Sequence, residues 1–215
     1  MLLDPTETRQ ALERLAKSKE QVFGSQIHKF KLNRVLGEDE VEWFERNYAI
    51  ALPEDYRHFV TKIGNGGAGP TYGVFPLGFM DDTGAGLKRW KERNDLVGDL
   101  SEPFQFDATW NDLTGLPSNN LADADEDEYD REMKAFETRY WDGSLMNGAI
   151  PICHTGCALR VWLVVSGKQA GRLWHDGRAD YSGIAPMFRA DGSPHSFSSW
   201  YFDWLEESLR TLEAS

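Results

Sequence analysis

The feature that most constrains this fold is an apolar helical pattern that runs directly into a cluster of glycines. In residues 52–63, "LPEDYRHFVTKI", the proline suits a first helical turn and the two acidic residues complement the positive end of a helix dipole. Its apolar residues recur at helical spacing, and they are Tyr56, Phe59, Val60 and Ile63. Gly64 follows where a glycine commonly ends a helix. We therefore predict a helix with one buried face that ends at residue 63.

The glycine cluster that follows, "GNGGAGP", also matches the dinucleotide-binding pattern G-x-G-x-x-G. In that kind of site the glycines come after a strand and open a helix, whereas here a helix comes first. The Gly-Lys-Ser/Thr ending of a phosphate loop is missing as well. We predict a structural turn in which glycines allow positive φ, with a nucleotide phosphate site as the alternative. The turn residues are Gly64, Asn65, Gly66, Gly67, Gly69 and Pro70.

Helical and strand patterns elsewhere predict one α+β domain. Helical spacing of apolar residues marks residues 5–19, 37–48, 123–141 and 196–214, the last capped by Ser196 or Ser198. Short apolar runs predict strands in residues 148–157, 159–165 and 172–180, with Asp176–Gly177 as a turn dipeptide. Residues 77–121 are turn-rich and have no clear periodicity. We expect a central antiparallel or mixed sheet with flanking helices in residues 27–215, and an N-terminal helical extension in residues 1–26.

Charge and composition exclude several classes of protein. The 35 acidic residues outnumber the 23 basic ones, for a net charge of −12, which argues against direct binding of nucleic acid. Hydrophobic residues make up 40% of the chain, too many for a disordered protein. No apolar run approaches the roughly 20 residues of a membrane span, and Asp4 and Pro5 interrupt a signal peptide. Two cysteines do not make a disulfide framework, so we expect a cytoplasmic protein.

The segment "CHTGC" contains the residues that most resemble a chemical site. Cys153, His154 and Cys157, with His175, could supply metal ligands, but a structural zinc site needs a second cysteine knuckle, which is missing. Cys157 and His154 could also form a nucleophile pair. We expect both cysteines to be small residues of the core, and we expect no cofactor.

A strongly acidic run precedes and opens the predicted helix at residues 123–141. Residues 123–132 contain seven acidic side chains and one Arg, a local charge of −6 and half of the net −12. A calcium loop does not fit, because its sixth position would be Glu128 and its twelfth Lys134. The run is either a solvated helix start or a docking surface for a basic partner. The candidate partner-binding residues are Asp123, Asp125, Glu126, Asp127, Glu128 and Asp130.

The helix and glycine turn, "ALPEDYRHFVTKIGNGGAGPTYGVFPL", resemble the signature of the SUKH superfamily. In that signature a Leu-Pro-x-x-Tyr/Phe helix runs into an Asn-Gly-Gly turn, as at Leu52, Pro53, Tyr56, Asn65, Gly66 and Gly67. The segments "HTGCALRVWLVVSGKQAGRLWHDGRAD" and "FSSWYFDWLEESL" are similar to a bacterial subgroup. The resemblance covers about residues 27–209 and is loosest between Gly78 and Met146.

This resemblance implies both a fold and a function. The superfamily joins fungal cell-wall assembly regulators to bacterial immunity proteins, and its fold is one α+β domain. It offers no shared catalytic residues, so the resemblance implies a protein that is not an enzyme. A bacterial member would bind and neutralise a cognate toxin, for example a nuclease with a basic surface. The alternatives are a cytosolic regulatory or scaffold domain and, third, an enzyme that uses Cys157 or the glycine turn. The acidic run lies outside the signature, so partner specificity is expected there.

Overall fold

The computed structural model describes residues 2–18, 22–82, 86–90, 96–118, 120–121 and 125–213, and its centre is an antiparallel sheet. The strand order is β3-β4-β5-β6. These strands are Ala149–Gly156 (β3), Leu159–Val164 (β4), Leu173–Gly177 (β5) and Gly183–Pro186 (β6). A separate hairpin pairs Phe79–Asp82 (β1) with Gly86–Arg89 (β2). The expected α+β class is confirmed, and every strand pair among the described residues is antiparallel.

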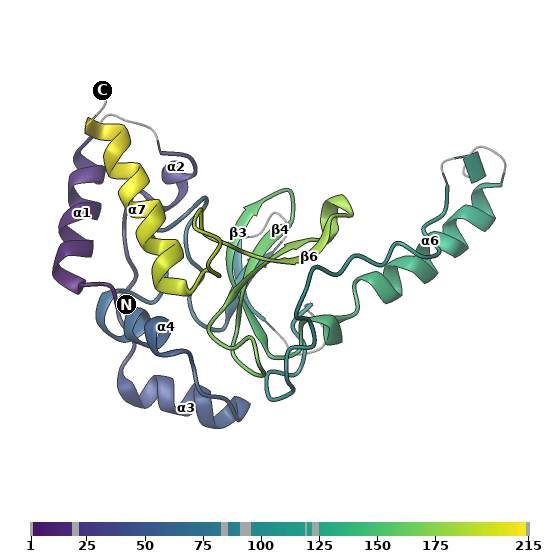
Figure 1. The fold of residues 1–215 in the computed structure, drawn as a ribbon, viewed down its shortest axis with the longest axis horizontal. Coiled ribbons are helices and arrows are strands. Elements are labelled where there is room, and N and C mark those ends of the chain that lie inside the picture. Colours follow the sequence, from purple (N-terminus) through teal and green to yellow (C-terminus); the bar gives the residue numbers. More distant parts are fainter. Residues whose placement is uncertain are drawn as a thin grey trace.

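Most of the helices lie on one side of this sheet. Figure 1 shows α1, α3, α4 and α7 gathered on one side of the sheet, while α6 projects away on the other. The helices are Pro5–Lys17 (α1), Ser25–His28 (α2), Glu38–Tyr48 (α3), Glu54–His58 (α4), Glu126–Tyr140 (α6) and Phe197–Glu213 (α7), with short turns at Gly143–Met146 (η2) and Arg178–Asp180 (η3). Ser196 caps α7, because its hydroxyl accepts the Ser199 N–H while the Ser199 hydroxyl accepts the Ser196 N–H. None of the described helices has the length and apolar character needed to cross a membrane.

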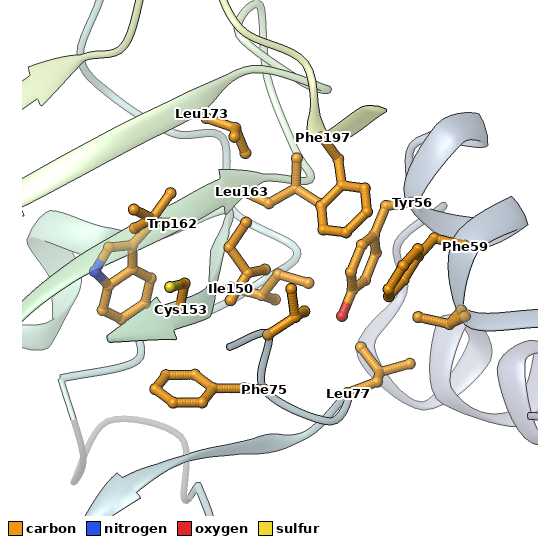
Figure 2. Close-up of a cluster of buried hydrophobic side chains, with 14 of the residues drawn as sticks. Tyr56, Phe59, Phe75, Leu77, Ile150, Cys153, Trp162, Leu163, Leu173 and Phe197 are labelled. Carbon is orange, nitrogen blue, oxygen red and sulfur yellow. The ribbon is translucent and has the colours of Figure 1, made fainter. Parts of the chain in front are cut away.

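The helix that precedes the glycine turn is confirmed, with one difference. Its predicted apolar face is buried, and Figure 2 shows Tyr56, Phe59 and Phe197 gathered against Ile150 and Leu163 of the sheet. The difference is that α4 continues as a π-helix, Phe59–Ile63 (η1), in place of regular α-helix. The N–H of Gly64 accordingly donates to the carbonyl of Phe59, five residues back, at 2.9 Å.

The three predicted strands are correct in position, but one predicted turn is wrong, and β1, β2 and β6 were not predicted. Four consecutive residues of β4, Val161–Val164, are buried, as expected of a strand covered on both faces. Asp176–Gly177 is not a turn, because it ends β5 and the chain turns in η3. The hairpin of β1 and β2 lies in the stretch for which no element was predicted. Its strands have four residues each, which is too short to establish a period.

The N-terminal helix is tied to the helix before the glycine turn. Leu12 and Leu15 of α1 are buried in the common core. The guanidinium of Arg9 donates to the carbonyls of Lys62 and Ile63, at 2.9 and 2.8 Å. The Arg9 side chain thereby provides hydrogen-bond donors for two carbonyls at the end of η1, which have no donor within the helix. The helix ends at Lys17, and Lys19 of the predicted span lies outside the described residues. A domain boundary at residue 26 stays a prediction.

Candidate functional site

Two of the glycines in the turn have the positive φ that was predicted. The φ angles are 78° at Gly66 and 102° at Gly67. A Cβ at Gly66 would lie 2.6 Å from the carbonyl oxygen of Val74, and one at Gly67 would lie 2.4 Å from that of Lys31. Gly64 has an extended backbone with φ of −179°, so its position does not require a left-handed conformation. Both the backbone angle and the close approach therefore require glycine at Gly66 and Gly67.

The backbone amides from Gly64 to Ala68 are already hydrogen-bonded within the protein. The N–H of Gly67 donates to the carbonyl of Val74 at 2.8 Å, and the N–H of Ala68 donates to the carbonyl of Lys31 at 2.8 Å. The Asn65 side chain accepts the N–H of Leu77 at 2.8 Å. A phosphate site needs amides that point at the ligand, whereas these amides join neighbouring chain segments. The geometry therefore supports the structural interpretation of the glycine turn.

The two cysteines lie in different environments. Cys153 is buried in β3, and burial raises the pKa of its thiol to about 12, so it is a thiol and not a nucleophilic thiolate at neutral pH. Cys157 is exposed in the two-residue turn between β3 and β4, which differs from the expectation that both cysteines are core residues. His154 stacks on Tyr72 at 5.4 Å between ring centroids. Within the described ranges, no group of three His, Cys, Asp or Glu side chains could hold a metal ion.

The acidic run lies at the N-terminal end of α6. Asp125 caps this helix, and its carboxylate accepts the N–H of Glu128 at 3.0 Å. The side chains of the other described candidates form no ion pair or hydrogen bond with the described part of the chain, and all of them are exposed; they are Glu126, Asp127, Glu128 and Asp130. Asp123 lies outside the described residues. The carboxylates are thus available to a partner.

The helix that carries the acidic run projects from the body of the protein. We call α6 and residues 111–118 together the acidic arm. The two segments are joined, because the guanidinium of Arg139 in α6 donates to the carbonyl of Thr114. Figure 1 places the start of α6 at the far end of this arm. Only Phe136 and Tyr140 of α6 are buried, both near its C-terminal end. Tyr129 and Met133 lie on the same helical face but are half-exposed, so this face is covered only in the inner half of the helix.

A buried ion pair holds the base of the acidic arm. Arg178 is fully buried and makes two hydrogen bonds of 2.8 Å to the carboxylate of Asp176. Its guanidinium also donates to the carbonyl of Tyr140, the last residue of α6, at 3.1 Å. At the other end of the arm, Trp110, which directly precedes residue 111, exchanges two backbone hydrogen bonds with Ile184 of β6. These contacts tie both ends of the arm to the sheet. Sequence reasoning missed the pair because Asp176 was assigned to a turn.

Comparison with known proteins identifies a family. Residues 36–190 match the sequence model of the SMI1 / KNR4 family (SUKH-1), more than two thirds of the 215 residues. The matched range includes the glycine turn, the sheet and the acidic arm, and it leaves α1 and α7 outside. No curated protein and no solved structure has a significant match to this chain.

Proposed function

This chain belongs to the SMI1/KNR4 family (SUKH-1), and from that membership we propose that it is a non-enzymatic binding protein that neutralises a cognate toxin. In the turn that resembles a nucleotide-binding motif, the amides from Gly64 to Ala68 are hydrogen-bonded within the protein. The buried Cys153 is held as a thiol, and the exposed Cys157 lies on a hairpin turn. These features support a role in binding over a role in catalysis.

The acidic arm is the observation that carries the proposal. In its described part, residues 125–132 contain six acidic side chains and one Arg, a charge of −5 in eight positions. The carboxylates are exposed on a helix whose base is fixed by Arg178. A concentrated charge of this kind accelerates encounter with a basic partner. Because the arm is already ordered, binding loses little conformational entropy.

The dimensions of the arm suit a groove on the toxin. Its helix has 15 residues, about 22 Å at 1.5 Å per residue. A nuclease binds the phosphates of its substrate in a basic groove, and a row of carboxylates on a projecting helix competes for the same groove. We therefore propose a toxin with a basic substrate-binding surface, occupied stoichiometrically by the arm.

The alternative function is a cytosolic regulatory or scaffold domain like the fungal members of the family. One observation favours it, which is that large apolar side chains are exposed on separate elements. Trp43 lies on α3, Tyr181 follows η3 and Phe188 follows β6. Several such surfaces would suit a protein with several partners.

Co-expression in the native host distinguishes the two functions. Each open reading frame adjacent to this gene is expressed with and without the chain, and growth is measured. Toxin neutralisation predicts one frame whose product stops growth alone, permits growth with the chain and co-purifies with it in a 1:1 complex. Several co-purifying host proteins and no toxic neighbour would contradict it and support the scaffold function.

A further inference from the structure

A groove of about 710 Å³ lies apart from the acidic arm, between α2, the glycine turn and the two β-hairpins. Ile27 of α2 and Lys31 line it from one side, and Leu87 of β2 lines it from another. The turn between β3 and β4 contributes Cys157 and Ala158. Figure 1 shows α2 and the outer end of α6 on opposite sides of the sheet. The groove and the arm are therefore separate surfaces.

The floor of the groove is held by backbone hydrogen bonds. Leu32 bridges to Gly67, Gly67 to Val74, and Val74 to Cys153 of β3, so these segments continue the sheet sideways. Gly67 and Val74 exchange two hydrogen bonds of 2.8 Å. A Cβ at Gly73 would lie 2.4 Å from the Gly67 carbonyl oxygen, so the two backbone segments pack too closely there for a side chain. The groove is therefore formed before any partner binds.

Aromatic and aliphatic side chains border the groove. Phe23 lies 5.4 Å from Tyr72, which in turn stacks on His154 at 5.4 Å, measured between ring centroids. Phe23 is 65% exposed, Ile27 64% and Leu87 52%. Of the eight large apolar residues exposed in the described part of the chain, Ile27 and Leu87 line this groove, and Phe23 packs against Tyr72 at its border. Such a cluster marks an interaction site more than scattered apolar residues do.

The groove carries a positive charge, whereas the protein as a whole is negatively charged. Asp81 lines it, but two hydrogen bonds of 2.8 Å from Arg160 neutralise this carboxylate. Lys31 is exposed and makes no ion pair with the described residues. His28 is neutral at pH 7, because burial lowers its pKa to about 4. On a chain of net charge −12, this groove therefore presents an ammonium without an ion-pair partner among the described residues, beside apolar side chains.

The strand that lines the groove offers a backbone edge. β2 pairs with β1 along one edge, and its other edge has no strand partner in the described part of the chain. Such an edge can accept an extended chain by strand addition. We propose that the groove binds an extended segment of a partner protein in which a large apolar side chain is followed by an acidic one. The apolar side chain fills the groove and the carboxylate pairs with Lys31. This site is independent of the toxin assignment.

The proposal is tested by NMR titration of the ¹⁵N-labelled protein with three synthetic peptides. The first is acetyl-GTFETG-amide, the second replaces Glu by Lys, and the third replaces Phe by Ala. We expect the first to shift amides of residues 71–75, 86–89 and 154–158 and to bind about fivefold more tightly than the other two. Lys31→Glu should reverse the preference between the Glu and Lys peptides. Leu87→Ser should weaken binding of both peptides that contain Phe.

Two variants and one small ligand complete the test. Lys168→Glu changes an exposed lysine that does not line the groove, and it should leave the peptide preference unchanged. Neutralising the acidic arm should not affect peptide binding either. Equal affinities for the Glu and Lys peptides, or no shifts at up to about 5 mM peptide, would overturn the proposal. If 4-phenylbutyrate binds as tightly as the first peptide, the groove is a small-molecule site and the peptide proposal is wrong.

Discussion

Arg178 forms a buried bidentate ion pair with Asp176, two residues before it, and the same guanidinium holds the last carbonyl of α6. A charge pair in the interior is stable only while both partners and their hydrogen bonds are present. The orientation of the acidic arm therefore depends on a contact made in the core of the sheet.

Replacing Arg178 by Met should destabilise the fold by about 3–5 kcal/mol, because Asp176 is left buried without a counter-charge. Urea unfolding measures the loss. Arg189→Met is the matched control, since Arg189 and Asp203 pair at a half-exposed site and should contribute about 1 kcal/mol or less. A double variant, Asp176→Leu with Arg178→Met, should recover part of the loss. Similar losses for Arg178→Met and Arg189→Met would contradict this account.

Gly67→Ala should lower the free energy of unfolding by about 2 kcal/mol or more, since the new Cβ meets both a positive φ and the Lys31 carbonyl. Gly192→Ala separates these causes. Gly192 has a φ of 82°, but a Cβ there would meet nothing within 4 Å, so its loss should be about 1 kcal/mol. Equal losses of unfolding free energy for Gly67→Ala and Gly192→Ala, in thermal or urea unfolding, would mean that the contact between the new Cβ and the Lys31 carbonyl costs nothing.

The third prediction concerns the acidic arm. Replacing Asp125 and Asp127 by Asn and Glu126 and Glu128 by Gln should slow association with the toxin about tenfold at low salt and flatten its salt dependence. The helix cap should survive, because Asn caps as well as Asp. Stopped-flow association rates against ionic strength provide the measurement.

The control for the arm removes the same number of charges elsewhere. Its four exposed residues are Glu13, Glu42, Glu102 and Glu206, each replaced by Gln. Because charge far from the interface steers weakly at physiological salt, this variant should keep most of the wild-type salt slope. If both quadruple variants have the wild-type slope, the arm is only a solvated helix and does not dock the toxin.

The two cysteines should differ in reactivity. One thiol per native chain, that of the exposed Cys157, should react quickly with a disulfide reagent at pH 8. Cys153 should react only after unfolding, because it is buried and its pKa is raised to about 12. Cys157→Ser should remove the fast phase and leave one thiol that titrates in urea. Rapid reaction of two thiols in the native protein would show that β3 is more open than its burial indicates.

Mild acid should destabilise the protein in part through His28. Its folded pKa of about 4 lies below the ordinary value of 6.5, so the unfolded chain binds the proton first as pH falls. The contribution of His28 is complete above pH 6.5 and is lost progressively toward pH 4. His28→Gln should therefore lose less stability between pH 7 and pH 5 than the wild type in urea unfolding. Parallel pH dependences would contradict the buried, neutral state of this imidazole.

Local chemistry in the sequence was enough to predict the helix, the glycine turn and the buried strand. The spacing of Tyr56 and Phe59 defines one apolar face, and the almost entirely apolar run in residues 159–165 predicts a strand covered on both faces. The positive φ at Gly67 follows from glycines placed after a helix. These properties depend on neighbours in the chain, so the sequence alone determined them.

The tertiary structure decided what covers each face. Tyr129 and Tyr140 share one helical face, but only Tyr140 reaches the sheet, so periodicity predicts the face and not its partner. Asp176 resembled a turn residue until the fold placed Arg178 beside it in the core. Lys31 and Leu87 are 56 positions apart and meet at one groove only because the glycine turn continues the sheet between them. Contacts between distant residues depend on the fold as a whole, which is why no local pattern in the sequence indicated them.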